Sequence, residues 1–138
     1  MPVLLYSTVV MEYVPRGVTM PKLLSELPLR QRVFDQEVSF LAAQPGPAIC
    51  ESLILCYDAG KPYIVDSLNL GFRARLGKGN NNEVVKQIAD KKYGAIQTNT
   101  PANQKPSVRF PDEVLDAIDH SYVEELTGHD CHIYVPRP

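Results

Sequence analysis

The chain has 138 residues, of which 44% are hydrophobic and 22% are charged, and its formal net charge is -2. A chain of this length predicts one domain, residues 1–138, that buries about two thirds of its unfolded surface. The near balance of charges argues against nucleic acid or an anionic membrane as a partner.

The N-terminal residues 3–10 are aliphatic and β-branched, which predicts a buried strand. No basic residue precedes this run and no small-residue cleavage site follows it, so we expect no secretory signal. The run is also shorter than the roughly 20 apolar residues of a transmembrane helix. We therefore expect no transmembrane segment, and a cytoplasmic location for the chain standing alone.

The middle of the chain alternates short apolar runs with helical patterns. Residues 22–43 predict a helix that Pro28 should split into two pieces. A strand at 48–50, a helix at 53–59 and a second strand at 63–65 are expected to follow. Two strands joined this compactly through a helix predict a parallel pair.

The second half of the chain continues the alternation after a turn-rich region at residues 71–82. The expected elements are a helix at 83–92 capped by Asn82, a strand at 94–98, a helix at 111–126 and an edge strand at 133–135. This pattern predicts an α/β domain, a small three-layer sandwich with a mostly parallel sheet of four or five strands and helices on both faces.

Polar residues gather where the predicted strands end. In parallel sheets the functional crevice lies beyond the carboxyl ends of the strands, and the residues expected at this rim are Glu51, Ser52, Asp66, Gln97 and Thr98. Glu51 and Asp66 could together bind a metal, share a proton or hold sugar hydroxyls. The alternative, which we favour, is that each carboxylate simply caps a helix or turn.

The turn-rich region, GFRARLGKGNNN, carries basic residues ahead of the helix at residue 83. Arg73, Arg75 and Lys78 could hold a phosphate there together with backbone amides. The segment matches neither the Walker nor the dinucleotide fingerprint, so a plain basic surface loop is favoured. If phosphate binds at all, we expect it at Arg73 and Lys78.

The three cysteines are too few for a disulfide framework, which indicates reduced surroundings. Cys50 and Cys56 have no activating positive neighbour and lack the Cys-x-x-Cys spacing, so both are expected to be small core residues. Residues 129–132 include two histidines and Cys131, but neighbours on a strand face opposite ways and cannot close a metal site locally. We therefore predict no metal, cofactor or catalytic residue.

A family resemblance rests on the motifs Gly46-Pro47, Cys50-Glu51, Ala59-Gly60-Lys61-Pro62, Asp66 and Tyr93-Gly94-Ala95-Ile96-Gln97. In this order, and with a looser continuation to residue 136, they resemble the soluble C-terminal domain of bacterial polyprenol-phosphate-dependent membrane glycosyltransferases related to dolichyl-phosphate-mannose-protein mannosyltransferases.

The resemblance implies that transfer chemistry belongs to acidic residues in loops of a membrane portion, so no catalytic residue is carried over to this chain. It also implies an extracytoplasmic location if the chain is a fragment of such a protein. Residues 1–27 depart from the transmembrane helix that should precede the domain.

The leading functional hypothesis is a non-catalytic accessory or ligand-binding domain that contacts a membrane glycosyltransferase or a lipid-linked sugar. Its expected ligand-binding residues are Glu51, Ser52, Asp66, Gln97, Arg73 and Lys78. One alternative is a small transferase or hydrolase that uses the two carboxylates at the rim. Another is a structural interaction protein that self-associates through an edge strand or its N-terminal apolar segment.

Overall fold

The structure is a computed structural model that describes residues 20–138. The strand predicted at residues 3–10 lies outside the described residues. The chain divides into two compact units, one ending at Asp35 and the other spanning Gln36–Pro138. The second unit holds the sheet and every candidate site residue.

Helix α2, Met20–Ala43, runs through Pro28 without a break, so the predicted split is wrong. A proline removes one backbone hydrogen bond and crowds the carbonyl four residues earlier. Here that carbonyl belongs to Leu24, which is exposed, so water can hydrate it and the helix continues. The last turns of α2 belong to the second unit and bury Glu37 and Leu41.

The sheet has four strands in the order β1-β2-β4-β3. β1 (Ala48–Cys50) pairs in parallel with β2 (Ala95–Thr98), whereas β4 (His132–Pro136) pairs antiparallel with both β2 and β3 (Tyr122–Thr127). The domain is therefore α/β as expected, but its sheet is mixed, and the prediction of a mostly parallel sheet is wrong.

The predicted strand at residues 63–65 is absent, and this segment links α3 (Leu53–Asp58) to α4 (Ser67–Arg75). Its apolar character has another cause, because Val65 packs in the core while Tyr63 and Ile64 remain exposed. The parallel partner of β1 is instead β2, far away in the sequence.

The helix predicted at residues 111–126 ends earlier in the structure than expected. Helix α6 covers Asp112–Ser121, and the chain then passes directly into β3. No glycine or proline marks this change, so the helical pattern gave no stop signal. Because β3 takes the edge, β4 lies between two strands and is not the edge strand that we expected.

Two further boundaries differ from the prediction. Helix α5 covers Asn82–Ala89 with Asn81 as its N-cap, so the predicted cap lies one residue too late. Helix α4 also occupies part of the expected turn-rich region, because Gly71 is a helical residue there. A Cβ at Gly71 would lie 2.4 Å from the carbonyl oxygen of Val108, so this glycine serves a close approach between two segments.

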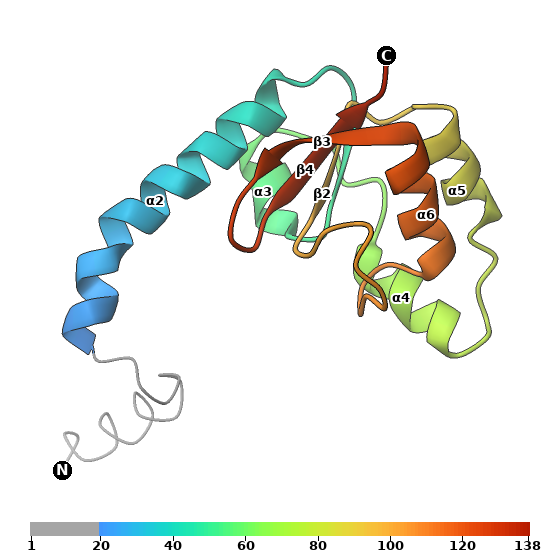
Figure 1. Cartoon of the computed structure of the whole chain (residues 1–138), viewed down its shortest axis with the longest axis horizontal. Helices are drawn as coiled ribbons and strands as arrows, with labels where there is room; N and C mark the ends of the chain where they lie inside the picture. Colours follow the sequence, from blue (N-terminus) through green and yellow to red (C-terminus); the bar gives the residue numbers. More distant parts are fainter. Residues whose placement is uncertain (1–19) are drawn as a thin grey trace, which may run out of the picture. The chain divides into compact units, whose positions relative to one another are not determined.

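Helices α4, α5 and α6 lie on one side of the sheet and α3 lies on the other (Figure 1). Because side chains alternate along a strand, β1 and β2 each send residues to both sides. Ile49 and Ile96 belong to the core against α5 and α6, while Cys50 and Gln97 point the opposite way, toward α3. Aromatic and aliphatic side chains complete that core: Tyr93, Phe110, Val114, Leu115, Ile118, Tyr122 and Tyr134.

Candidate functional site

The carboxyl ends of β1 and β2 meet as predicted, and their polar residues bond to one another. The Glu51 carboxylate accepts a hydrogen bond from the backbone N–H of Asn99 at 2.6 Å. The Ser52 backbone N–H donates to the Gln97 side-chain oxygen at 2.8 Å, and the Gln97 amide group donates to the Asn99 side chain at 2.9 Å. We call this set of four residues the rim network.

The rim network fixes the backbone of two neighbouring turns. Gln97 is fully buried, and the backbone N–H of Glu51 also donates to its carbonyl oxygen at 3.0 Å. Thr98, the other predicted rim residue, is buried and donates its hydroxyl to the carbonyl oxygen of Thr100. These side chains are therefore occupied in holding backbone groups.

Asp66 lies apart from the rim network and caps helix α4. Its carboxylate accepts the backbone N–H of Asn69 at 3.0 Å, which is the capping role favoured from the sequence. Desolvation and a hydrogen bond to Asp66 raise the pKa of Tyr63. Glu51 and Asp66 thus bond to different segments, and no shared site of the two carboxylates is built in the described residues.

A second place does bring predicted residues together. Residues of α4, of the preceding link and of α5 line a cavity of about 190 Å³, which we call the α4 hollow: Ile64, Val65, Asp66, Asn69, Leu70, Arg73 and Val84. Within residues 20–138, no hydrogen bond or ion pair holds the Arg73 guanidinium. Lys78 is not among the lining residues, and it follows α4 in a turn where its N–H donates to the Arg73 carbonyl oxygen.

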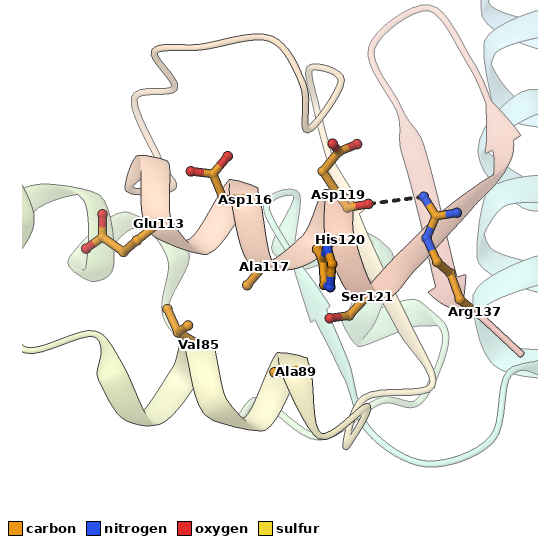
Figure 2. A pocket seen from close by; sticks show the side chains of 9 residues that line it. All are labelled: Val85, Ala89, Glu113, Asp116, Ala117, Asp119, His120, Ser121 and Arg137. Atoms are coloured by element: carbon orange, nitrogen blue, oxygen red, sulfur yellow. Dashed lines mark hydrogen bonds between the residues drawn. The ribbon is translucent and has the colours of Figure 1, made fainter.

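A larger groove, which the sequence analysis missed, lies between α5 and α6 (Figure 2). Its lining residues are Val85, Ala89, Glu113, Asp116, Ala117, Asp119, His120, Ser121 and Arg137. Most of its charged groups are already engaged. Asn81 donates to Glu113, Lys105 pairs with Asp116, and the Arg137 guanidinium donates to the backbone oxygen of Asp119 at 3.1 Å.

The sequence signal for this groove is the pair of acidic residues in the first turn of α6, Asp112 and Glu113, and a helix N-terminus explains them by itself. None of the hydrogen bonds in the groove joins a nucleophile to a base. We therefore assign no catalytic role to this groove.

Cys50 and Cys56 are buried as predicted, but they form a disulfide with a Cα–Cα distance of 5.9 Å, so the expectation that they are reduced is wrong. The bond ties the end of β1 to helix α3, directly beside Glu51. A strand followed by one helical turn brings two residues six positions apart into reach, and a search for the Cys-x-x-Cys spacing does not detect this geometry.

Cys131 is the free cysteine, and it is buried. Burial, the nearby Glu37 carboxylate and a hydrogen bond to it raise the pKa of Cys131 to about 12. Burial also raises the pKa of Glu37, although the bond with Cys131 acts against this effect. A thiol with so high a pKa is a poor nucleophile and a poor metal ligand at neutral pH.

The histidines near Cys131 have separate partners. His129 pairs with Asp130 on the surface, and His132 bonds to Glu124 at 2.6 Å. In residues 20–138, no group of three metal-ligating side chains comes together, and no helix is long and apolar enough to cross a membrane.

No family model matches the chain, and neither the curated proteins nor the solved structures give a match. The likeness to the glycosyltransferase domain therefore depends on the motifs of the sequence alone, and the function must be argued from the geometry.

Proposed function

We propose that this domain is a non-catalytic accessory domain that binds a small polar ligand of the sugar or sugar-phosphate class, as part of or beside a membrane glycosyltransferase. The observation that carries the proposal is the α4 hollow, in which the Asp66 carboxylate and the Arg73 guanidinium share an apolar lining.

The groups in the α4 hollow fit this ligand class. Asp66 keeps acceptor capacity beyond its capping bond, Asn69 offers both a donor and an acceptor, and Arg73 offers a fork of donors for hydroxyl or phosphate oxygens. Val65 and Leu70 supply apolar contact for the C–H face of a sugar ring. Ligand sites usually measure about 300–1,000 Å³, so the smaller α4 hollow suits a single ring.

The rim network supports an accessory role rather than a catalytic one. A general acid or base must reach its substrate's proton, whereas Glu51 holds the backbone N–H of Asn99 and Gln97 holds that of Ser52. The Glu51 and Asp66 carboxylates also bond to different segments of the chain. This arrangement favours a domain that recognises a ligand without transforming it.

The disulfide favours one cellular compartment over another. Such bonds persist in oxidising environments and are rare in the cytosol, and here one joins Cys50 to Cys56. We therefore favour the extracytoplasmic location that the resemblance implies over the cytoplasmic one expected for a chain standing alone.

The proposal is tested by the thermal midpoint of the protein with monosaccharides, sugar phosphates, short polyprenyl phosphates and inorganic phosphate. A ligand at about 100 times its dissociation constant stabilises the fold by about 2.7 kcal/mol. We expect the shift to vanish in Arg73→Gln and to weaken in Asp66→Asn. Asparagine caps a helix as well as aspartate does, so the second variant removes charge while keeping α4 intact.

A matched control is Lys92→Gln, which removes one exposed positive charge away from the α4 hollow. Its shift should equal that of the wild type. A hit that survives both Arg73→Gln and Asp66→Asn, or no hit from the whole panel, contradicts the proposal. Loss of the shift in Lys78→Gln as well would extend the site to the basic turn after α4 and identify phosphate as the recognised group.

A further inference from the structure

Helix α4 presents a stripe of large apolar side chains to solvent. Leu68, Phe72 and Leu76 are 50%, 56% and 53% exposed. Their spacing of four residues places them along one side of the helix. Val108, which is 63% exposed, belongs to the loop against which the helix packs. We call these four residues the α4 stripe.

The packing of α4 keeps the stripe outward. Ser67 and Gly71 are buried on the other side of the helix, and Gly71 meets the Val108 carbonyl oxygen so closely that even a methyl group would not fit. The Arg75 guanidinium donates to that same oxygen at 3.0 Å. Helix α4 is therefore anchored to the loop and cannot roll to bury the stripe within this unit.

The charge within residues 67–82, the segment that carries Leu68, Phe72 and Leu76, has one sign. Residues 67–82 contain Arg73, Arg75 and Lys78 and no aspartate or glutamate, although the whole chain has a net charge of -2. Two acidic residues flank this segment, Asp66 at the N-cap of α4 and Glu83 in the first turn of α5. The bulk charge that argued against an anionic membrane thus conceals a local basic region beside exposed leucine and phenylalanine.

We propose that α4 docks this domain onto an anionic lipid surface. Exposed leucine and phenylalanine on one side of a helix, followed by basic residues, are features of helices that lie in the headgroup region of a bilayer. The stripe enters the headgroup region, while Lys78 approaches the anionic headgroups. The exposed stripe could also bind a protein partner, but the basic charge of residues 67–82 favours lipid.

The α4 stripe and Lys78 do not line the α4 hollow, so this proposal does not depend on the ligand proposed there. We expect the protein to co-sediment with phosphatidylcholine vesicles that contain phosphatidylglycerol, and to bind pure phosphatidylcholine much more weakly. Added salt should weaken the binding because it screens the charges.

The double variant Phe72→Ser/Leu76→Ser should bind about tenfold or more weakly, because both exposed anchors are lost. The matched control is Leu53→Ser/Ile54→Ser on α3, where the side chains are 47% and 52% exposed. That control should bind as the wild type does. All four replaced side chains are exposed, so both proteins should keep their fold, and equal thermal midpoints check this. Lys78→Glu should also weaken binding to the anionic vesicles.

Three results would overturn the proposal. The first is the absence of binding to anionic vesicles, and the second is an equal loss in the α3 control pair. The third is self-association that only Phe72→Ser/Leu76→Ser abolishes, which would assign the stripe to a protein interface. Asp66→Asn leaves the stripe intact, so wild-type vesicle binding in that variant separates this proposal from the one on the ligand.

Discussion

Replacing Gln97 with alanine should destabilise the fold without touching any ligand. The side chain is fully buried, and its oxygen accepts the Ser52 backbone N–H at 2.8 Å. Alanine leaves that N–H without its partner, which costs about 1–3 kcal/mol, and it opens a cavity in a packed interior. The hydrogen bond that the Gln97 amide group donates to Asn99 contributes less to the loss, because Asn99 is half-exposed and its side chain can bond to water instead. We expect a total loss of about 2–4 kcal/mol.

The assay for this prediction is urea unfolding, in which the midpoint should fall while the slope stays unchanged. The control is Gln104→Ala in an exposed loop, which should lie within about 0.5 kcal/mol of the wild type. A loss below about 1 kcal/mol in Gln97→Ala would refute the reasoning that the rim network is structural. Unchanged stability combined with lost ligand binding would instead make the rim the binding site.

Three further predictions concern other parts of the second unit. The raised pKa and burial of Cys131 predict one thiol that iodoacetamide reaches only on unfolding, and rapid alkylation of the native protein would contradict this. In urea unfolding, Gly94→Ala should lower the free energy of unfolding by about 3 kcal/mol or more, because its Cβ would lie 1.6 Å from the Pro45 carbonyl oxygen. Gly46→Ala, at φ 70° with open space around it, should lower it by only about 1 kcal/mol. Equal losses in the two variants would contradict this prediction. Burial raises the pKa of Glu124, but side-chain hydrogen bonds, including one to His132, outweigh it and lower the pKa below 4.5. The stability advantage of the wild type over Glu124→Gln should therefore be complete above pH 4.5 and shrink as the pH falls through the lowered pKa, and a difference that does not change with pH would refute the assignment.

Local signals predicted several elements correctly. The strand at 48–50, the short helix after it and the cap at Asp66 were all read from neighbouring residues, and the structure confirms them. Pairing between distant strands was out of reach. β1 pairs with β2 across more than 40 residues, and residues 63–65 offered an equally apolar partner at shorter range. Nothing in the spacing separates these two choices.

The expectation that Asp66 lies at the sheet rim beside Glu51 was wrong for a related reason. Glu51 and Asp66 follow apolar segments of similar appearance, but only the first segment belongs to the sheet, so the two carboxylates lie in different places. Gly71 suggested a turn, whereas the structure uses it for close packing of α4, and that packing carries Arg73 into the α4 hollow. These outcomes depend on tertiary contacts that the spacing of residue types does not reveal.

The most direct test of the account is to map amide chemical-shift changes by nuclear magnetic resonance while a monosaccharide phosphate is titrated into the protein. The account predicts that the changes concentrate on residues 64–73 and at Val84, around the α4 hollow. It also predicts that Ser52 and Asn99, in the rim network, remain unperturbed. Changes centred on those two residues would contradict the account and return the site to the ends of the strands.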